Sequence, residues 1–247
     1  MTPYHLVPWQ WAVVVTGAFL VGLSKTGIPG IGILAVALFA IVIPAKESSG
    51  VVLPVLIAAD VIAVAAYRRH AQWNHLWGLF PWAALGILLG YLTVGHIRSE
   101  QVNVLIGLLL LGMVVLHLYR KLRGDDADKV PTSLLFTASM GILGGFTTMV
   151  ANAAGPVMIL YLLAMRLPKN EFMGTSAWYF FLLNCFKVPF SANLGLINAA
   201  SLQLDLPLMA VSMAGAAFGK QLLPYINQRA FEAIALAFTL IAAFRLL

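Results

Sequence analysis

Two glycine-rich stretches interrupt long apolar runs at matching places in the two halves of this chain. The first reads Gly22-Leu-Ser-Lys-Thr-Gly-Ile-Pro-Gly-Ile-Gly32, and the second reads Gly145-Phe-Thr-Thr-Met-Val-Ala-Asn-Ala-Ala-Gly-Pro156. Unpaired backbone groups cost several kcal/mol each in hydrocarbon, so irregular backbone inside a bilayer lies only against a protein-lined cavity. Breaks at corresponding positions of two halves are typical of a transporter's binding site.

The apolar runs around these breaks predict membrane-spanning helices. Hydrophobic residues make up 61% of the 247 positions and charged residues only 10%, and stretches such as 12–24 and 76–95 carry no charge. Such runs are long enough to cross a bilayer. We therefore expect an all-α polytopic membrane protein, with helices at 9–23, 30–43, 48–67, 76–95, 101–119, 132–148, 155–166, 171–190, 203–219 and 229–246.

The two halves also repeat each other locally. Pro44-Ala-Lys-Glu47 with Gly50 recurs as Pro168-Lys-Asn-Glu171 with Gly174, and at the same offset Asp60 corresponds to Asn184. The repeat divides one integral membrane domain into a first repeat at 1–123, a cytoplasmic linker at 124–130 and a second repeat at 131–247.

The loop charges predict how each broken segment runs. If 9–23 with 30–43 and 132–148 with 155–166 are hairpins, ten Lys and Arg residues lie on one side of the membrane and three on the other. If each pair is instead one broken crossing helix, the split is seven to six. Because cytoplasmic loops carry the positive excess, hairpins are favoured, with inverted repeats and both termini outside the cytoplasm. Whether the arms span fully or are re-entrant stays open.

The breaks themselves predict an anion site. Helices that restart near Gly30 and Ala154 would present unpaired N–H groups and positive dipole ends inside the membrane. Neutral hydroxyl and amide groups lie close by. Alternatively, these small residues only allow close helix packing. The candidate donors are Ser24, Thr26, Thr147, Thr148 and Asn152.

Three ionisable residues lie inside apolar runs. Lys25 is a candidate partner for a substrate anion, and Lys187 is a second, although either could instead extend to an interface. Asp60 is a candidate for proton coupling or for balancing Lys25, with a hydrogen-bonded packing role as the alternative. Its counterpart Asn184 and the nearby Trp178 are further candidates for lining the cavity, with core packing as the alternative for Trp178.

Other classes of function lack support in the sequence. The net charge of +6 is spread over short loops without a basic face or RNA-binding motif, so we expect no nucleic-acid partner. The single cysteine and the scattered histidines show no metal-ligand spacing. No nucleophile elbow, phosphate loop or pair of catalytic carboxylates is recognisable. We expect neither an enzyme nor a cofactor.

At this level of detail the chain resembles the TauE/SafE family of sulfite and organosulfonate exporters. The resemblance rests on the duplicated break followed by Pro-x-x-Glu, on the second break, and on Gly174-Thr-Ser-Ala-Trp-Tyr with Asn184-Cys-Phe-Lys-Val-Pro189. It covers essentially the whole chain. The first break departs from the family's common Gly-x-Gly-Gly-Gly form.

The resemblance implies a secondary transporter of sulfite, sulfoacetate or a related organosulfonate in the cell membrane. It further implies proton coupling and possible homodimers. Our leading hypothesis is an exporter that works by alternating access around the two hairpin tips, Lys25 and Asn152. An uptake permease or channel for a small anion and a non-transporting membrane assembly protein remain as alternatives.

Overall fold

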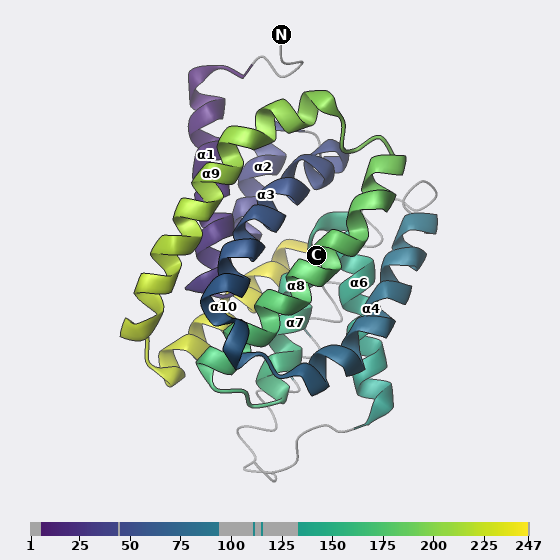
Figure 1. Ribbon diagram of the computed structural model, residues 1–247, viewed down its shortest axis with the longest axis vertical. Coiled ribbons are helices and arrows are strands. Elements are labelled where there is room, and N and C mark those ends of the chain that lie inside the picture. Colours follow the sequence, from purple (N-terminus) through teal and green to yellow (C-terminus); the bar gives the residue numbers. More distant parts are fainter. Residues whose placement is uncertain (1–5, 44, 94–110, 112–114, 116–132, 247) are drawn as a thin grey trace.

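The computed structural model describes residues 6–43, 45–93, 111, 115 and 133–246. These residues form helices and no strands (Figure 1). Among the described residues, four helices are long and apolar enough to cross a membrane, at Gly50–His70, Trp73–Thr93, Leu134–Ala151 and Ser201–Tyr225. The helices are α1 (Pro8–Thr26), α2 (Gly32–Val42), α3 (Ala45–Tyr67), α4 (Trp73–Thr93), α6 (Leu134–Ala151), α7 (Ala154–Ala164), α8 (Lys169–Asn193), α9 (Ala199–Leu222) and α10 (Gln228–Leu246), with short 3-10 turns at Arg68–His70 and Leu223–Tyr225.

The all-α prediction is confirmed for the described residues. Each predicted helix is present there, apart from the segment 101–119, which with the linker 124–130 falls almost wholly outside them. The observed boundaries lie within four residues of the predicted ones, and the helices continue through internal prolines. Pro189 does not end α8, and Pro207 lies within an α9 that begins four residues earlier than predicted. Membrane helices tolerate such prolines because neighbouring groups satisfy the freed carbonyls.

Both breaks are turns of helical hairpins. In the first hairpin, Gly17 of α1 packs against Phe39 of α2, and Ser24 packs against Gly32 nearer the turn. In the second, the rings of Phe136 in α6 and Tyr161 in α7 stack with their centroids 6.0 Å apart. The chain therefore reverses at each break, as the loop charges predicted.

The returning arms of the hairpins are short. Helices α2 and α7 have 11 residues each, whereas α1 and α6 have 19 and 18. At a rise of about 1.5 Å per residue, 11 residues extend about 16 Å, roughly half of a hydrocarbon core of about 30 Å. The returning arms are thus too short to cross a bilayer.

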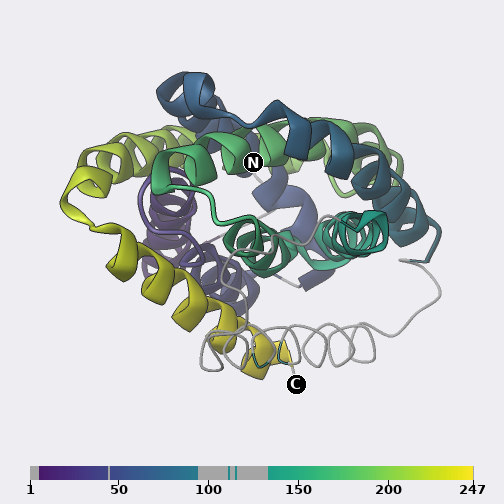
Figure 2. The ribbon, with the colours of Figure 1, turned by 90° about the horizontal axis from the view of Figure 1, so that it is seen from below.

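Close contacts between helix backbones follow the same pattern in the two halves. Gly22 in α1 lies directly against the backbone of Ser212 in α9, and the corresponding Gly145 in α6 lies against the backbone of Ala83 in α4. Figures 1 and 2 show the resulting pairs, α1 with α9 and α4 with α6, on opposite sides of the molecule. The reciprocal contacts are Gly215 with Phe19 and Gly86 with Ile142.

At the centre, two corresponding residues touch each other. The amide Nδ2 of Asn184 in α8 donates to Oδ2 of Asp60 in α3 at 2.6 Å, although the residues are 124 positions apart. A residue contacts its own counterpart only near an axis that relates two halves. Helices α3 and α8 therefore meet where such an axis would run. The inverted orientation of the halves stays a prediction.

Candidate functional site

A cavity of about 80 Å³ lies between the two hairpin turns. One water needs about 10–15 Å³, so this space has room for several waters or a small anion. Residues from both turns contribute to its wall, together with one face of α8. The lining residues are Val21, Ser24, Lys25, Pro29, Gly30, Gly32, Ile33, Val36, Leu56, Thr148, Asn152, Ala153, Gly155, Pro156, Ile159, Phe172, Ser176, Phe180 and Asn184.

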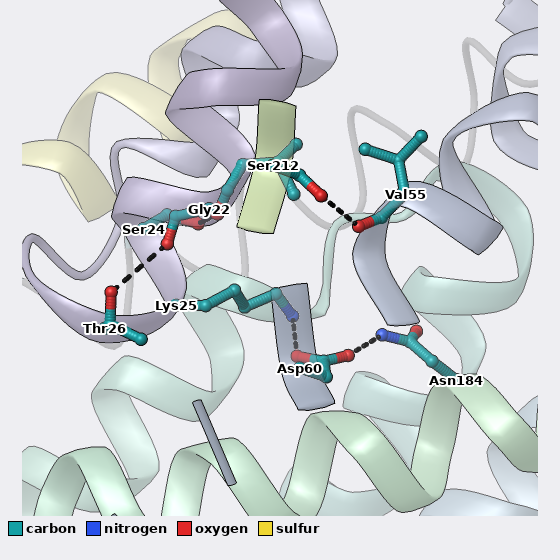
Figure 3. Close-up of polar contacts among 9 residues, drawn as sticks. Gly22, Ser24, Lys25, Thr26, Val55, Asp60, Asn184 and Ser212 are labelled. Atoms are coloured by element: carbon teal, nitrogen blue, oxygen red, sulfur yellow. Dashed lines mark hydrogen bonds and ion pairs between the residues drawn. The ribbon is translucent and has the colours of Figure 1, made fainter. Parts of the chain in front are cut away.

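Lys25 is the positive charge on this wall. Its Nζ lies 2.9 Å from Oδ1 of Asp60, and its side chain is 9% exposed while that of Asp60 is fully buried. The ammonium also lies 4.0 Å from the centre of the Phe180 ring, within the range of a cation–π interaction. Figure 3 shows the row that results, with Lys25 on one side of Asp60 and Asn184 on the other. Lys25 is thus held inside the protein and does not extend to an interface.

The second turn is held by another buried lysine. Asn152 ends α6 in the left-handed conformation, with φ of 53°. Lys187 of α8 is fully buried, donates to the carbonyl of Thr148 at 2.7 Å and also donates to Oδ1 of Asn152. Both acceptors lie at the C-terminal end of α6, where the helix dipole favours a cation. Lys187 therefore supports the turn from behind, and Asn152 forms part of the cavity wall.

Two helices begin at the cavity. Gly32 and Ile33 open α2, while Gly155 and Pro156 lie in the first turn of α7, and all four residues line the space. Neither helix has a side-chain cap at its N-terminus. The positive ends of both dipoles therefore act on the cavity that already holds Lys25.

Several predicted residues lie outside the cavity wall. Thr26 is buried, donates to the carbonyl of Ala216 at 2.6 Å, and has its own carbonyl bound by the Tyr67 hydroxyl at 2.7 Å. Thr147 is buried and donates back to Gly144 of its own helix at 3.2 Å. Asp60 and Lys187 also lie outside the wall, and so does Ala154, whose neighbour Ala153 lines it. Trp178 lies outside as well, and its ring packs against that of Trp73 with the centroids 5.1 Å apart.

The comparison with protein families adds an independent finding. The sequence pattern of the family described as Sulfite exporter TauE/SafE matches residues 14–246. The chain belongs to this family. No curated protein and no solved structure matches it.

Membership of the TauE/SafE family implies membrane transport of sulfite or a related anion. A cavity with a buried cation and two positive helix ends has the electrostatic character that such a substrate needs. The family is one of transporters, which agrees with the expectation that this chain is not an enzyme.

The sequence interpretation of this TauE/SafE chain missed one whole face of the cavity. Phe172, Ser176 and Phe180 recur every four residues along α8, and Asn184 continues the row. Residues at this spacing share one face of a helix. Counting back by fours from Asn184, which was already a candidate, would have found them.

Proposed function

We propose that this protein is a secondary transporter that exports a small sulfur-containing anion, such as sulfite, sulfoacetate or a related organosulfonate, by alternating access. The observation that carries the proposal is the cavity between the two turns, with Lys25 in its wall. A membrane enzyme would need a nucleophile and base at such a place, whereas the charged wall here suits binding of an anion. Family membership supports the class of substrate.

In this proposal the cavity residues hold the anion from opposite sides. Lys25 supplies the charge, Ser24 and Thr148 supply hydroxyl groups, and the amide of Asn152 and the first turns of α2 and α7 supply further polarity. Asn184 completes the wall beside Asp60. Thr26, Thr147 and Lys187 hold the turns in place. Asp60 couples transport to protons.

Alternating access is supported by the matching contacts of the two halves. The α1–α9 and α6–α4 pairs form two equivalent units on either side of α3 and α8, and such units can rock about a central site. The short arms α2 and α7 would bring both turns to about the middle of the bilayer. We propose inverted repeats with both termini outside the cytoplasm, and homodimers remain a further prediction.

Reconstitution into liposomes tests the proposal. Purified protein should move sulfite or sulfoacetate across the membrane, and a pH gradient should change the rate, whereas chloride should move more slowly. Lys25→Ala should reduce affinity at least about tenfold, because a buried charged hydrogen bond contributes about 1.5–3 kcal/mol. Lys220→Ala is the matched control, since Lys220 is exposed and lies outside the cavity wall.

The outcomes separate the alternatives. Equal flux of chloride and sulfite would favour a channel for small anions, and flux that accumulates sulfite inside cells would favour an uptake permease. If Lys25→Ala left both binding and flux unchanged, the role of Lys25 would be wrong. Absence of binding and flux for every anion would favour the non-transporting assembly protein.

A further inference from the structure

The cavity-facing groups Lys25 and Asn184 are both engaged by one carboxylate. Lys25 contacts Oδ1 of Asp60 at 2.9 Å, and Asn184 donates to Oδ2 at 2.6 Å (Figure 3). Both Lys25 and Asn184 line the cavity, whereas Asp60 lies behind them and is fully buried. An anion that enters the cavity therefore meets a lysine that already has a negative partner.

This arrangement makes Asp60 a competitor of the substrate. Opposite charges in contact attract strongly where the dielectric constant is low. The Asp60 carboxylate therefore stays paired with Lys25 as long as the carboxylate is ionised. A proton that adds to Asp60 neutralises it and weakens its hold on the ammonium. Lys25 can then pair with an anion in the cavity without leaving a second buried negative charge beside it.

Among the described residues, several elements packed against α3 carry ionisable groups. From α1 the charge that faces Asp60 is Lys25, whereas the amine of Lys187 on α8 faces the turn at Asn152. Helices α2 and α6 contain no Asp, Glu, Lys, Arg or His. On α8, Cys185 lies next to Asn184, and its thiol is exposed. The other ionisable residues on helices packed against α3 are Lys169, Glu171, Tyr179, Asp205 and Lys220, and the 3-10 turn after α3 adds Arg68, Arg69 and His70.

We propose that anion and proton cross the membrane together, in the same direction, with one proton carried on Asp60 for each anion that pairs with Lys25. This rests on the proposed transport function and adds its coupling rule. A proton from solution joins the Asp60 carboxylate to form a neutral acid, while Lys25 keeps its three hydrogens and pairs with the anion. After the anion leaves on the far side, the proton leaves and the ion pair closes again.

Methanesulfonate is the probe that separates the protein's proton from the substrate's own. It stays ionised throughout the accessible pH range, unlike sulfite, so any proton that moves with it travels on the protein. In liposomes loaded with methanesulfonate and a pH-sensitive dye, efflux should make the lumen alkaline, with one proton leaving per anion. Its affinity should weaken about tenfold per pH unit once Asp60 is ionised in the unliganded protein, as linkage to one proton requires.

Two acid variants locate the proton. Asp60→Asn should move methanesulfonate without protons and with an affinity that no longer depends on pH. Asp205→Asn is the matched control, because Asp205 is also fully buried but lies on α9 outside the cavity wall, and it should keep wild-type coupling. The wild-type proton measurement decides the question even where a variant does not fold.

The outcomes distinguish this inference from the function on which it rests. Anion flux without proton flux in the wild type, or protons moving opposite to the anion, overturns the coupling rule and leaves the transporter intact. Unchanged coupling in Asp60→Asn overturns the assignment to Asp60. If the wild type moves neither methanesulfonate nor sulfite nor chloride, the transport function itself fails and the coupling rule fails with it.

Discussion

Replacing Lys25 by methionine should destabilise the protein, because the buried carboxylate of Asp60 loses its positively charged partner. The variant removes the ammonium 2.9 Å from Oδ1 and leaves a fully buried carboxylate that keeps the hydrogen bond from Asn184. Removing one member of a buried ion pair costs about 3–5 kcal/mol, because the other charge stays behind. In a chain of this size each kcal/mol lowers the Tm by about 2–4 °C, so we expect a fall of roughly 6–20 °C.

A double variant separates stability from binding. In Lys25→Met with Asp60→Asn neither charge remains, and replacing a buried pair by neutral groups of similar volume is often neutral for stability. We expect thermal unfolding in detergent to return most of the way to the wild-type Tm. Anion binding should stay lost, because the cavity still lacks its cation. Lys220→Met is the control for removal of an exposed lysine.

Two results would refute this reasoning. If Lys25→Met melted at the wild-type temperature, the ion pair with Asp60 would not stabilise the folded protein. If the double variant bound sulfite as tightly as the wild type, Lys25 would not be the group that attracts the anion, whatever its effect on stability.

Three further predictions concern the turns and the contacts between the halves. Gly155→Ala should change the free energy of unfolding by no more than about 0.5 kcal/mol, because a Cβ there meets no atom within 4 Å. In a competition assay it should weaken binding of sulfoacetate more than binding of the smaller sulfite. Asn152→Ala should cost about 1–2 kcal/mol more in unfolding experiments than Asn152→Gly, because the φ of 53° is unfavourable for alanine, while both should weaken anion binding. Gly22→Ala and Gly145→Ala should each destabilise by about 1–3 kcal/mol and by similar amounts, since each added methyl would meet a backbone carbonyl; a large difference in Tm would contradict the equivalence of the two contacts.

The hairpins were predictable because their evidence is spread along the chain. Gly, Pro and small polar residues mark the two breaks, and the loop charges favour reversal over crossing at each. The contacts of Gly17 with Phe39 and of Phe136 with Tyr161 confirm both reversals. These features depend on composition and on local backbone chemistry, which a single sequence records directly.

The roles of individual hydroxyl groups were not predictable in the same way. Thr147 and Thr148 are adjacent in the second break, yet Thr147 bonds back to its own helix and Thr148 faces the cavity. A threonine in a helix readily bonds to a carbonyl in the preceding turn, so its presence in a break does not indicate its direction. One of the two acceptors of Lys187 was hidden for a related reason, because the carbonyl of Thr148 is a backbone group that any residue would provide.

The contact between Asp60 and Asn184 at the centre joins two corresponding residues that differ in charge. Matching of the halves pairs Asp60 with Asn184, and the structure places them in direct contact, where two aspartates would repel each other. With an amide on one side, the centre holds one negative charge, and the one lysine in the cavity wall balances it. In the proposed coupling a single competing carboxylate takes up one proton, so we expect one proton for each anion. A measured ratio of two would require a second acid in the cycle, and the buried Asp205 would then be the first residue to test.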